Sequence, residues 1–218
     1  MIKGKFIEEC KHRFLAKVNI NGQEEECYMP TSSKLSKLID LQNREVYLME
    51  NMGDSLRTKY KVHSVSIKNN LILLDLNCLN KLFFSEILLN DTKYLPERKI
   101  DNLKVDFVNE EKNEVVEIKG LISDNKNIIF PHINATRIIR QLKILGNSYG
   151  NIRFVFILMN PKINRIILDK NNKEFMKYFK LAMNKQVKFE IYKIYWEKDK
   201  EHLRRVEYEF KKDVFKII

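Results

Sequence analysis

Two short segments decide the fold of the second half of the chain: Lys-Val-Asp-Phe at residues 104–107 and Val-Val-Glu-Ile-Lys at residues 115–119. A short polar turn separates these apolar stretches, and the pattern predicts two neighbouring antiparallel strands. Side chains alternate along a strand, so Glu117 and Lys119 share one face, and antiparallel pairing can bring Asp106 beside them.

These three side chains have the chemistry of a metal-dependent site for phosphodiester hydrolysis. Asp106 and Glu117 can hold a hard cation, Mg²⁺ or Mn²⁺, through oxygen atoms and leave positions for water and phosphate. Such a cation lowers the pKa of its water, and Lys119 can orient that water or help to deprotonate it. Glu86, on a predicted preceding helix, is available as a third metal ligand. We therefore predict Asp106, Glu117 and Lys119 as catalytic residues, and Asp106, Glu117 and Glu86 as metal ligands.

The spacing of these residues resembles the D-(x)n-E-x-K motif of the PD-(D/E)xK nuclease fold. Charged residues make up 32% of the chain, so a solvated strand face could produce the same letters by chance. The surroundings favour a site, because Val115, Val116 and Ile118 make the strand apolar and charges are costly there. The motif also lies within a helix–strand–strand–strand–helix–strand order, with a basic helix directly after it.

From about residue 78 onwards, strands alternate with helices, as is typical of an α/β domain. Residues 152–159 are nearly all apolar, which indicates a strand buried on both faces of a sheet. We expect the tail, residues 197–218, to pack on this domain. The predicted helices cover 79–89, 135–145 and 174–183, and the predicted strands cover 103–108, 114–119, 152–159 and 187–195.

The first third of the chain reads as strands separated by polar breaks. Asn21-Gly22 is a strong hairpin turn. Five strands with one short helix over 34–39 suit a small closed or partly open barrel, and an OB-like barrel fits best. The fold prediction is therefore an OB-like barrel over residues 1–77 and a PD-(D/E)xK nuclease-like α/β domain over residues 78–218. The five predicted strands cover 13–20, 24–29, 45–49, 60–67 and 71–74.

The net charge of +11 is unevenly distributed. Residues 133–190 carry 12 Lys/Arg against 3 Asp/Glu, directly after a net-acidic segment, 81–132, with 8 against 10. An acidic centre followed by a basic surface suits an enzyme that uses a metal on nucleic acid. Solvated helix faces in a lysine-rich chain are the alternative. The candidate nucleic-acid contacts are Arg57, Lys59, Lys61, Lys104, Arg137, Arg140 and Lys143.

Several function classes lack support. The three cysteines are widely spaced and form no CxxC pair, which argues against a zinc ribbon and a disulfide framework. No secretory signal and no membrane-spanning run is visible, so we expect a cytoplasmic protein without membrane association. There is no Gly-rich phosphate loop and no G-x-S-x-G motif. The oligomeric state stays open.

Short patches, in the right order from residue 14 to residue 195, resemble the sugar fermentation stimulation protein A (SfsA) family. Three lie in the predicted barrel: FLAKV (14–18) resembles F-x-A-R-V, MPTSSKL (29–35) resembles L-P-N-T-G-R-L, and LRTKY (56–60) resembles R-K-T-K-Y. Four lie beyond it: residues 80–86 resemble a P-N-x-L helix start, and VDF (105–107), VEIK (116–119) and FPH (130–132) resemble S-R-x-D-F, V-E-V-K and F-P-D-A.

The resemblance implies an OB-like domain joined to a PD-(D/E)xK nuclease-like domain, in a DNA-binding protein with a proposed role in regulating sugar (maltose) metabolism. The chain is similar to a divergent member of the family. Leu103-Lys104 stands where the family has S-R, His132 stands where it has the aspartate of F-P-D-A, and Gln141 stands where its following helix has a histidine. His132 can be a metal ligand, a base or simply the residue at a helix start.

Three hypotheses follow for the function. The first is a DNA-binding regulator, with double-stranded DNA as its partner and a weak or idle nuclease-like site. The second is an active Mg²⁺- or Mn²⁺-dependent DNA endonuclease that uses Asp106, Glu117 and Lys119. The third is a protein-interaction module whose basic surface only reflects composition.

Overall fold

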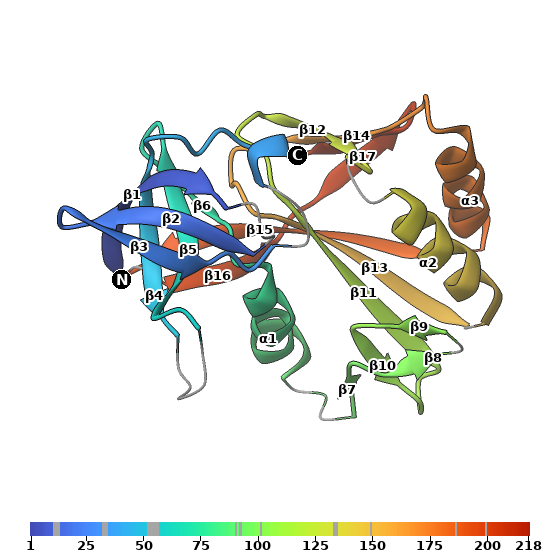
Figure 1. Cartoon of the computed structure of the whole chain (residues 1–218). Coiled ribbons are helices and arrows are strands. Elements are labelled where there is room, and N and C mark those ends of the chain that lie inside the picture. Colours follow the sequence, from blue (N-terminus) through green and yellow to red (C-terminus); the bar gives the residue numbers. More distant parts are fainter. Residues whose placement is uncertain are drawn as a thin grey trace.

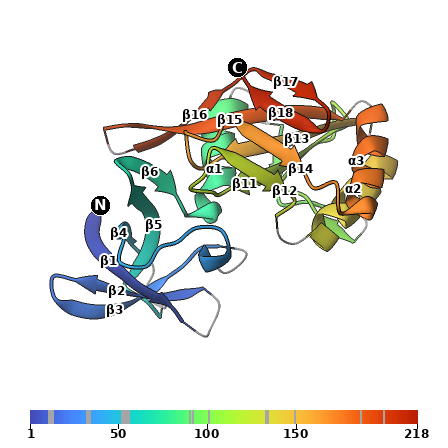
Figure 2. The same cartoon turned by 90° about the horizontal axis from the view of Figure 1, so that it is seen from above.

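The structure is a computed structural model of the chain. Figure 1 shows a barrel at one end of the molecule and a sheet covered by helices at the other, and Figure 2 shows the same separation from above. The structure describes residues 1–10, 14–31, 35–51, 57–89, 91, 93–100, 102–132, 135–148, 150–185, 187–198 and 200–218.

The N-terminal strands close into a five-stranded barrel, which confirms the predicted barrel. The order is β3-β2-β1-β4-β5, and a parallel pairing of β3 with β5, Cys27 opposite Tyr60, closes the ring. A sixth strand, β6 (Asn70–Leu73), extends the sheet beside β5. The barrel strands are β1 (Ile2–Glu9), β2 (Leu15–Ile20), β3 (Gln23–Tyr28), β4 (Glu45–Glu50) and β5 (Tyr60–Ile67).

The first barrel strand, β1, was missing from the sequence prediction, whose five strands correspond to β2 to β6. The pattern of β1 is interrupted by Gly4, and glycine weakens a strand signal. The structure shows why glycine is there: a Cβ at Gly4 would lie 2.5 Å from Val18 Cγ1 on β2. The predicted helix over 34–39 is also shorter, a 3₁₀ turn, η1 (Leu35–Lys37), whose first N–H groups donate to the Glu9 carboxylate.

The second half is built on a six-stranded sheet of order β16-β15-β13-β11-β10-β7. Its three central strands, β11, β13 and β15, are parallel, and β10 joins β11 antiparallel with Phe107 opposite Val116. The antiparallel pairing of the two motif strands is therefore confirmed. The strands are β7 (Leu95–Pro96), β10 (Phe107–Asn109), β11 (Glu114–Leu121), β13 (Asn151–Leu158), β15 (Lys188–Glu197) and β16 (Lys200–Arg205).

Helices cover both faces of this sheet. α2 (Ala135–Ser148) and α3 (Lys173–Asn184), which correspond to the helices predicted over 135–145 and 174–183, pack on one face. The other face meets α1 (Leu79–Phe83), which is preceded by a 3₁₀ turn, η2 (Leu76–Cys78), and continues as a π-helical segment, η3 (Phe84–Leu88). The helix predicted over 79–89 is thus present, but its second half is π-helical instead of α-helical.

Smaller sheets complete the fold. The tail forms a hairpin of β17 (Tyr208–Lys211) and β18 (Val214–Ile217). β18 pairs with β14 (Arg165–Leu168), which pairs with β12 (Asn127–Phe130), so the tail packs on the domain as expected. A two-stranded ribbon joins β8 (Lys99–Ile100) to β9 (Leu103–Lys104). The predicted strand over 103–108 is therefore split between β9 and β10, and Asp106 lies in the break between them.

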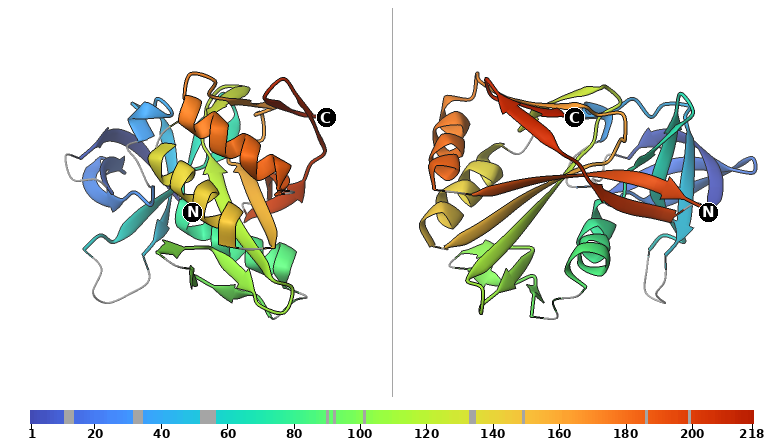
Figure 3. Two further views of the ribbon diagram at one scale, coloured as in Figure 1. Left: turned by 90° about the vertical axis from the view of Figure 1, so that its right-hand side faces the viewer. Right: turned by 180° about the vertical axis from the view of Figure 1, so that it is seen from behind.

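The barrel and the sheet share one apolar core. Barrel residues and α1 pack with the sheet face that carries Val116, Ile118 and Val155 in a single cluster. The long β15–β16 hairpin reaches the barrel (Figure 3), where Trp196 Nε1 donates to the Leu71 carbonyl over 3.0 Å. The helices are too short and too polar to span a membrane: none in the described part of the chain meets that requirement.

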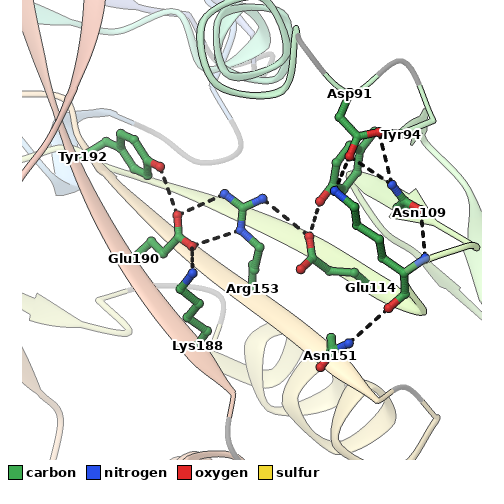
Figure 4. Close-up of polar contacts among 10 residues, drawn as sticks. Asp91, Tyr94, Asn109, Glu114, Asn151, Arg153, Lys188, Glu190 and Tyr192 are labelled. Carbon is green, nitrogen blue, oxygen red and sulfur yellow. Dashed lines mark hydrogen bonds and ion pairs between the residues drawn. The ribbon is translucent and has the colours of Figure 1, made fainter.

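A buried charged network spans the three parallel strands near their first residues (Figure 4). Arg153 on β13 donates to both carboxylate oxygens of Glu190 on β15, over 3.0 and 3.1 Å, and lies 3.5 Å from Glu114 on β11. Tyr192 donates to Glu190 and Tyr94 to Glu114. Burial alone would raise the pKa of Glu190, but the Arg153 guanidinium holds it below its usual range.

We predict that Glu190→Gln destabilises the fold by about 3–5 kcal/mol at pH 7, because it removes one charge of a buried pair. The pKa of Glu190 is lowered by folding, so its contribution is present above the unfolded pKa of about 4.3 and is lost as pH falls through the lower folded pKa. Urea unfolding at pH 7 and at pH 3 measures both effects. Glu209→Gln, at an exposed pair with Lys211, is the matched control and should change little. Equal stability of the two variants would contradict the prediction.

Candidate functional site

A cavity of about 810 Å³ opens between the barrel, η2–α1, the β7–β10–β11 edge and α2. Asp106, Glu117 and Lys119 all line it, so the structure brings the three predicted catalytic residues together. Glu117 and Lys119 project from the same face of β11, as their spacing predicted. Asp106 reaches them from the break before β10. The cavity is therefore the candidate functional site.

Asp106 is fixed by two hydrogen bonds. The Ile118 backbone N–H donates to its Oδ2 over 2.7 Å, and Asn80 Nδ2 donates to its Oδ1 over 2.9 Å. The break between β9 and β10 lets this carboxylate reach a backbone group of β11 instead of continuing a strand. Each carboxylate oxygen has two lone pairs, so both oxygens keep capacity for a further partner.

Glu117 is almost fully buried, with 2% of its surface exposed. Lys119 Nζ and Gln141 Nε2 both donate to its Oε1. Among the described residues, its Oε2 is buried without a hydrogen-bond partner, and so is Oε1 of Gln141. Burial has the largest effect on the pKa of Glu117, which is raised to about 7. The positive charge of Lys119 acts to lower this pKa, and the negative charge of Asp106 acts to raise it.

The unpartnered oxygens fit a hard cation. Buried polar atoms are almost always hydrogen-bonded, so two such oxygens in one cavity call for a ligand or a proton. Mg²⁺, Mn²⁺ and Ca²⁺ prefer carboxylate and amide oxygens, which Asp106, Glu117 and Gln141 supply. Within the described ranges, no group of three or more His, Cys, Asp or Glu side chains could hold a metal. A cation here would therefore complete its coordination with amide, water or substrate oxygens.

Glu86, the predicted third ligand, does not belong to this cavity. Its Oε1 lies 2.7 Å from His202 Nδ1, and its Oε2 accepts the Leu203 N–H over 2.7 Å, both on β16. The prediction assumed a helix that faces the motif strand. The π-helical winding of η3 and the neighbouring β16 instead give Glu86 a structural partner.

The structure places the predicted phosphate contacts of the second domain differently with respect to the cavity. Arg137 lines it, together with His132. Arg140 Nη2 donates to the Asn102 carbonyl over 3.0 Å, and Lys143 Nζ lies 5.8 Å from the centre of the Tyr178 ring. Lys104 pairs with Glu97 over 2.7 Å. Arg137 thus lies closest to the carboxylates, and Arg140 and Lys143 extend the positive charge along α2.

The three cations predicted on the barrel do not line the cavity. Arg57 pairs with Glu26 over 3.2 Å, and Lys59 lies 5.1 Å from the centre of the Tyr60 ring. Lys61 pairs over 2.7 Å with the fully buried Asp75. Because Asp75 would otherwise be an uncompensated buried charge, Lys61 is best understood as a structural partner.

Sequence reasoning missed two residues of the site. Asn80 stands in a patch that resembles the family helix, but its hydrogen bond to Asp106 depends on how α1 lies against β11. Gln141 was noted only as a replacement. It follows Arg137 by four residues, a spacing that puts both on one face of α2, and this signal could have identified it.

For the metal-free protein we predict that Glu117 makes stability fall as pH rises. Its folded pKa of about 7 exceeds the unfolded value of about 4.3, so the folded state binds the extra proton between these values. The loss of stability across this window is ~4 kcal/mol at most, and Glu117→Gln should remove it. Urea unfolding in chelator from pH 4 to pH 8 tests this. A Glu117→Gln curve parallel to that of the parent would contradict it.

Comparisons with known proteins agree with this architecture. A family model described as the sugar fermentation stimulation protein RE domain matches residues 74–200. The sugar fermentation stimulation protein homologue of Clostridium beijerinckii is 27% identical over 187 residues, covering 82% of each chain. The homologue of Pelagibacter ubique is 27% identical over 208 residues, covering 88% of this chain and 89% of the relative.

A solved structure has the same fold. SfsA of Pyrococcus furiosus, solved in complex with Ca²⁺, superposes with a TM-score of 0.75 at 16% identity and covers 94% of this chain and 92% of its own. The family model alone spans more than half of the sequence, including the whole β11 motif and α2. The resemblance in the short sequence patches is thereby confirmed, and the chain belongs to the sugar fermentation stimulation protein (SfsA) family.

Proposed function

We propose that this chain is a DNA-binding protein that holds a divalent cation between Asp106 and Glu117 and hydrolyses phosphodiester bonds. The observation that carries the proposal is the meeting of Asp106, Glu117 and Lys119 in one cavity, with two buried oxygen atoms left without partners. The Ca²⁺ in the structure of Pyrococcus furiosus SfsA supports a cation in this family. Mg²⁺ or Mn²⁺ is the cation proposed for activity.

The fold labels belong to the same proposal. A five-stranded barrel closed by parallel β3 and β5 supports an OB-like domain over residues 1–77. The order of α1, β10, β11, α2 and β13 supports a PD-(D/E)xK nuclease-like domain over residues 78–218. The apolar core that joins the two suggests that they act as one body.

In the proposed mechanism each residue has a separate task. Asp106 presents its carboxylate in an orientation fixed by Asn80 and the Ile118 N–H. Glu117 supplies the second carboxylate, and Gln141 orients it. The bound cation supplies Lewis acidity, which activates water and offsets phosphate charge. The Lys119 ammonium, 15% exposed beside Glu117, can donate to the attacking water or to a phosphate oxygen.

The second candidate is a DNA-binding regulator of sugar metabolism whose nuclease-like site is idle. One observation favours it: Lys119 and Gln141 both donate to the same oxygen of Glu117, an arrangement that also suits a structural ion pair. In that case the basic surface beside the cavity would carry the function. The two candidates differ in whether cleavage accompanies binding.

Separate variants of the cavity should distinguish metal binding from catalysis. Calorimetric titration with Mn²⁺ should show binding to the parent and to Lys119→Met, but none to Glu117→Gln, which loses an ionic ligand. Cleavage of DNA should fall by ~10²-fold or more in Lys119→Met if the ammonium acts in proton transfer. Glu86→Gln, at a carboxylate outside the cavity, is the matched control and should bind Mn²⁺ like the parent. Loss of stability in both cavity variants without selective loss of cleavage would support the idle site.

DNA binding should depend strongly on salt. Log K should fall with log salt by about 0.9 for each phosphate that a cation of the protein neutralises on duplex DNA. We predict that Arg140→Ala with Lys143→Ala lowers this slope by about 0.9 for each of the two side chains that meets a phosphate. Lys3→Ala with Lys5→Ala, on β1 at the opposite end of the molecule, should leave the slope unchanged. An affinity that stays flat from low to moderate salt would remove the DNA-binding proposal.

A further inference from the structure

We infer that the strand that reaches the carboxylates is single, with an unpaired base on the apolar wall of the cavity and its phosphate at Asp106 and Glu117. This inference rests on the proposed function and deepens it, because it names the form of nucleic acid that the site accepts. Three features of the cavity carry it: its depth, its apolar wall and its small number of cations.

The depth of the site excludes the body of a duplex. Glu117 is 2% exposed and Lys119 15% exposed, so a phosphate must enter the cavity to meet them. A volume of about 810 Å³ lies in the range of about 300–1,000 Å³ that encloses a small molecule. The major groove of B-DNA alone is about 12 Å wide, so the duplex is too bulky for such a space. A strand end or an unpaired nucleotide can enter.

Part of the lining of the cavity, called here its apolar wall, consists of apolar side chains from several elements. A paired strand shows mainly sugar and phosphate at its surface, and such a surface gains little from an apolar wall. An unpaired base, in contrast, buries its flat face on apolar and aromatic side chains. The wall is formed by Leu38, Leu76, Phe84, Ile122, Ile128 and Ile129.

Two residues of this wall are suited to hold a base. Phe84 is partly buried and stacks on Phe107, with ring centres 5.9 Å apart and planes tilted by 19°, which fixes the ring in position. Ile129, on β12, is a large apolar side chain left 50% exposed at the edge of the cavity. Exposed apolar side chains at a cavity are typical of a ligand-binding surface.

The positive charge of the cavity suits few phosphates. The Lys and Arg side chains among the described lining residues are Lys81, Lys119 and Arg137. Lys119 is paired with Glu117, so Lys81 on α1 and Arg137 on α2 are the cations placed to meet phosphates on either side of the scissile one. The remaining positive charge of α2 lies outside the cavity and can hold a flanking duplex.

The test compares one labelled strand, alone and annealed to its complement, in the Lys119→Met background with Mn²⁺. Fluorescence anisotropy should give binding to the single strand that is tighter by about tenfold or more, and Phe84→Leu, which keeps an apolar side chain but removes the ring, should weaken it by about tenfold. Ile129→Ser should also weaken single-strand binding. Leu181→Ser, at a residue 45% exposed on α3 and outside the cavity, is the matched control and should bind like the background.

Equal or tighter binding of the duplex would overturn the inference, and so would Phe84→Leu and Ile129→Ser variants that behave like Leu181→Ser. Cleavage by the parent protein with Mn²⁺ is measured on the same two substrates. A single-strand preference without any cleavage would overturn the proposed hydrolysis and leave the strand preference standing. Cleavage that is equally fast on both substrates would support hydrolysis and overturn the strand preference.

Discussion

The site depends on the hydrogen bond from the Ile118 backbone N–H to the Asp106 carboxylate. This bond replaces a strand-to-strand bond at the point where β10 begins, and it holds a charged group against an apolar sheet. Without this bond the Asp106 side chain would favour the solvent, because a free carboxylate is more stable in water than beside buried side chains. The same bond places Asp106 next to Glu117, whose pKa it helps to raise.

The two faces of β11 carry residues with different roles. Val116 and Ile118 belong to the core that the sheet shares with the barrel, while Glu117 and Lys119 line the cavity, which Ile118 also borders. Strand β11 therefore both packs in the core and supplies two side chains of the site. The Arg153–Glu190 network has a related role near the first residues of the parallel strands, because it ties β13 to β15 and β11 through buried charges that have partners. This network thus helps to specify the register of β11 against β13 near its first residues.

Much of this was predictable, and the failures have physical causes. The alternation along β11 and the antiparallel partner strand follow from local pattern, and so do α2, α3 and the barrel. The prediction of Glu86 as a metal ligand failed because helical spacing does not show which neighbour a side chain contacts. Its partner strand, β16, comes more than a hundred residues later in the sequence. Strand β1 was missed because Gly4, required by the close approach of Val18, interrupts its pattern. Contacts distant in sequence decide these positions, and local pattern does not contain them.

Gly120 lies where η2 and α1 pack against β11, the strand that carries Glu117 and Lys119. A Cβ there would lie 2.5 Å from Leu76 Cδ2 and 2.6 Å from Leu79 Cδ1, so a larger residue would require these two leucine side chains to move away from β11. That approach brings Asn80, the residue after Leu79, within 2.9 Å of Asp106. It also places Leu76 and Phe84 in the lining of the cavity that holds the carboxylates. The residue that follows the lysine of the motif therefore determines both the second hydrogen bond of Asp106 and the width of the cavity.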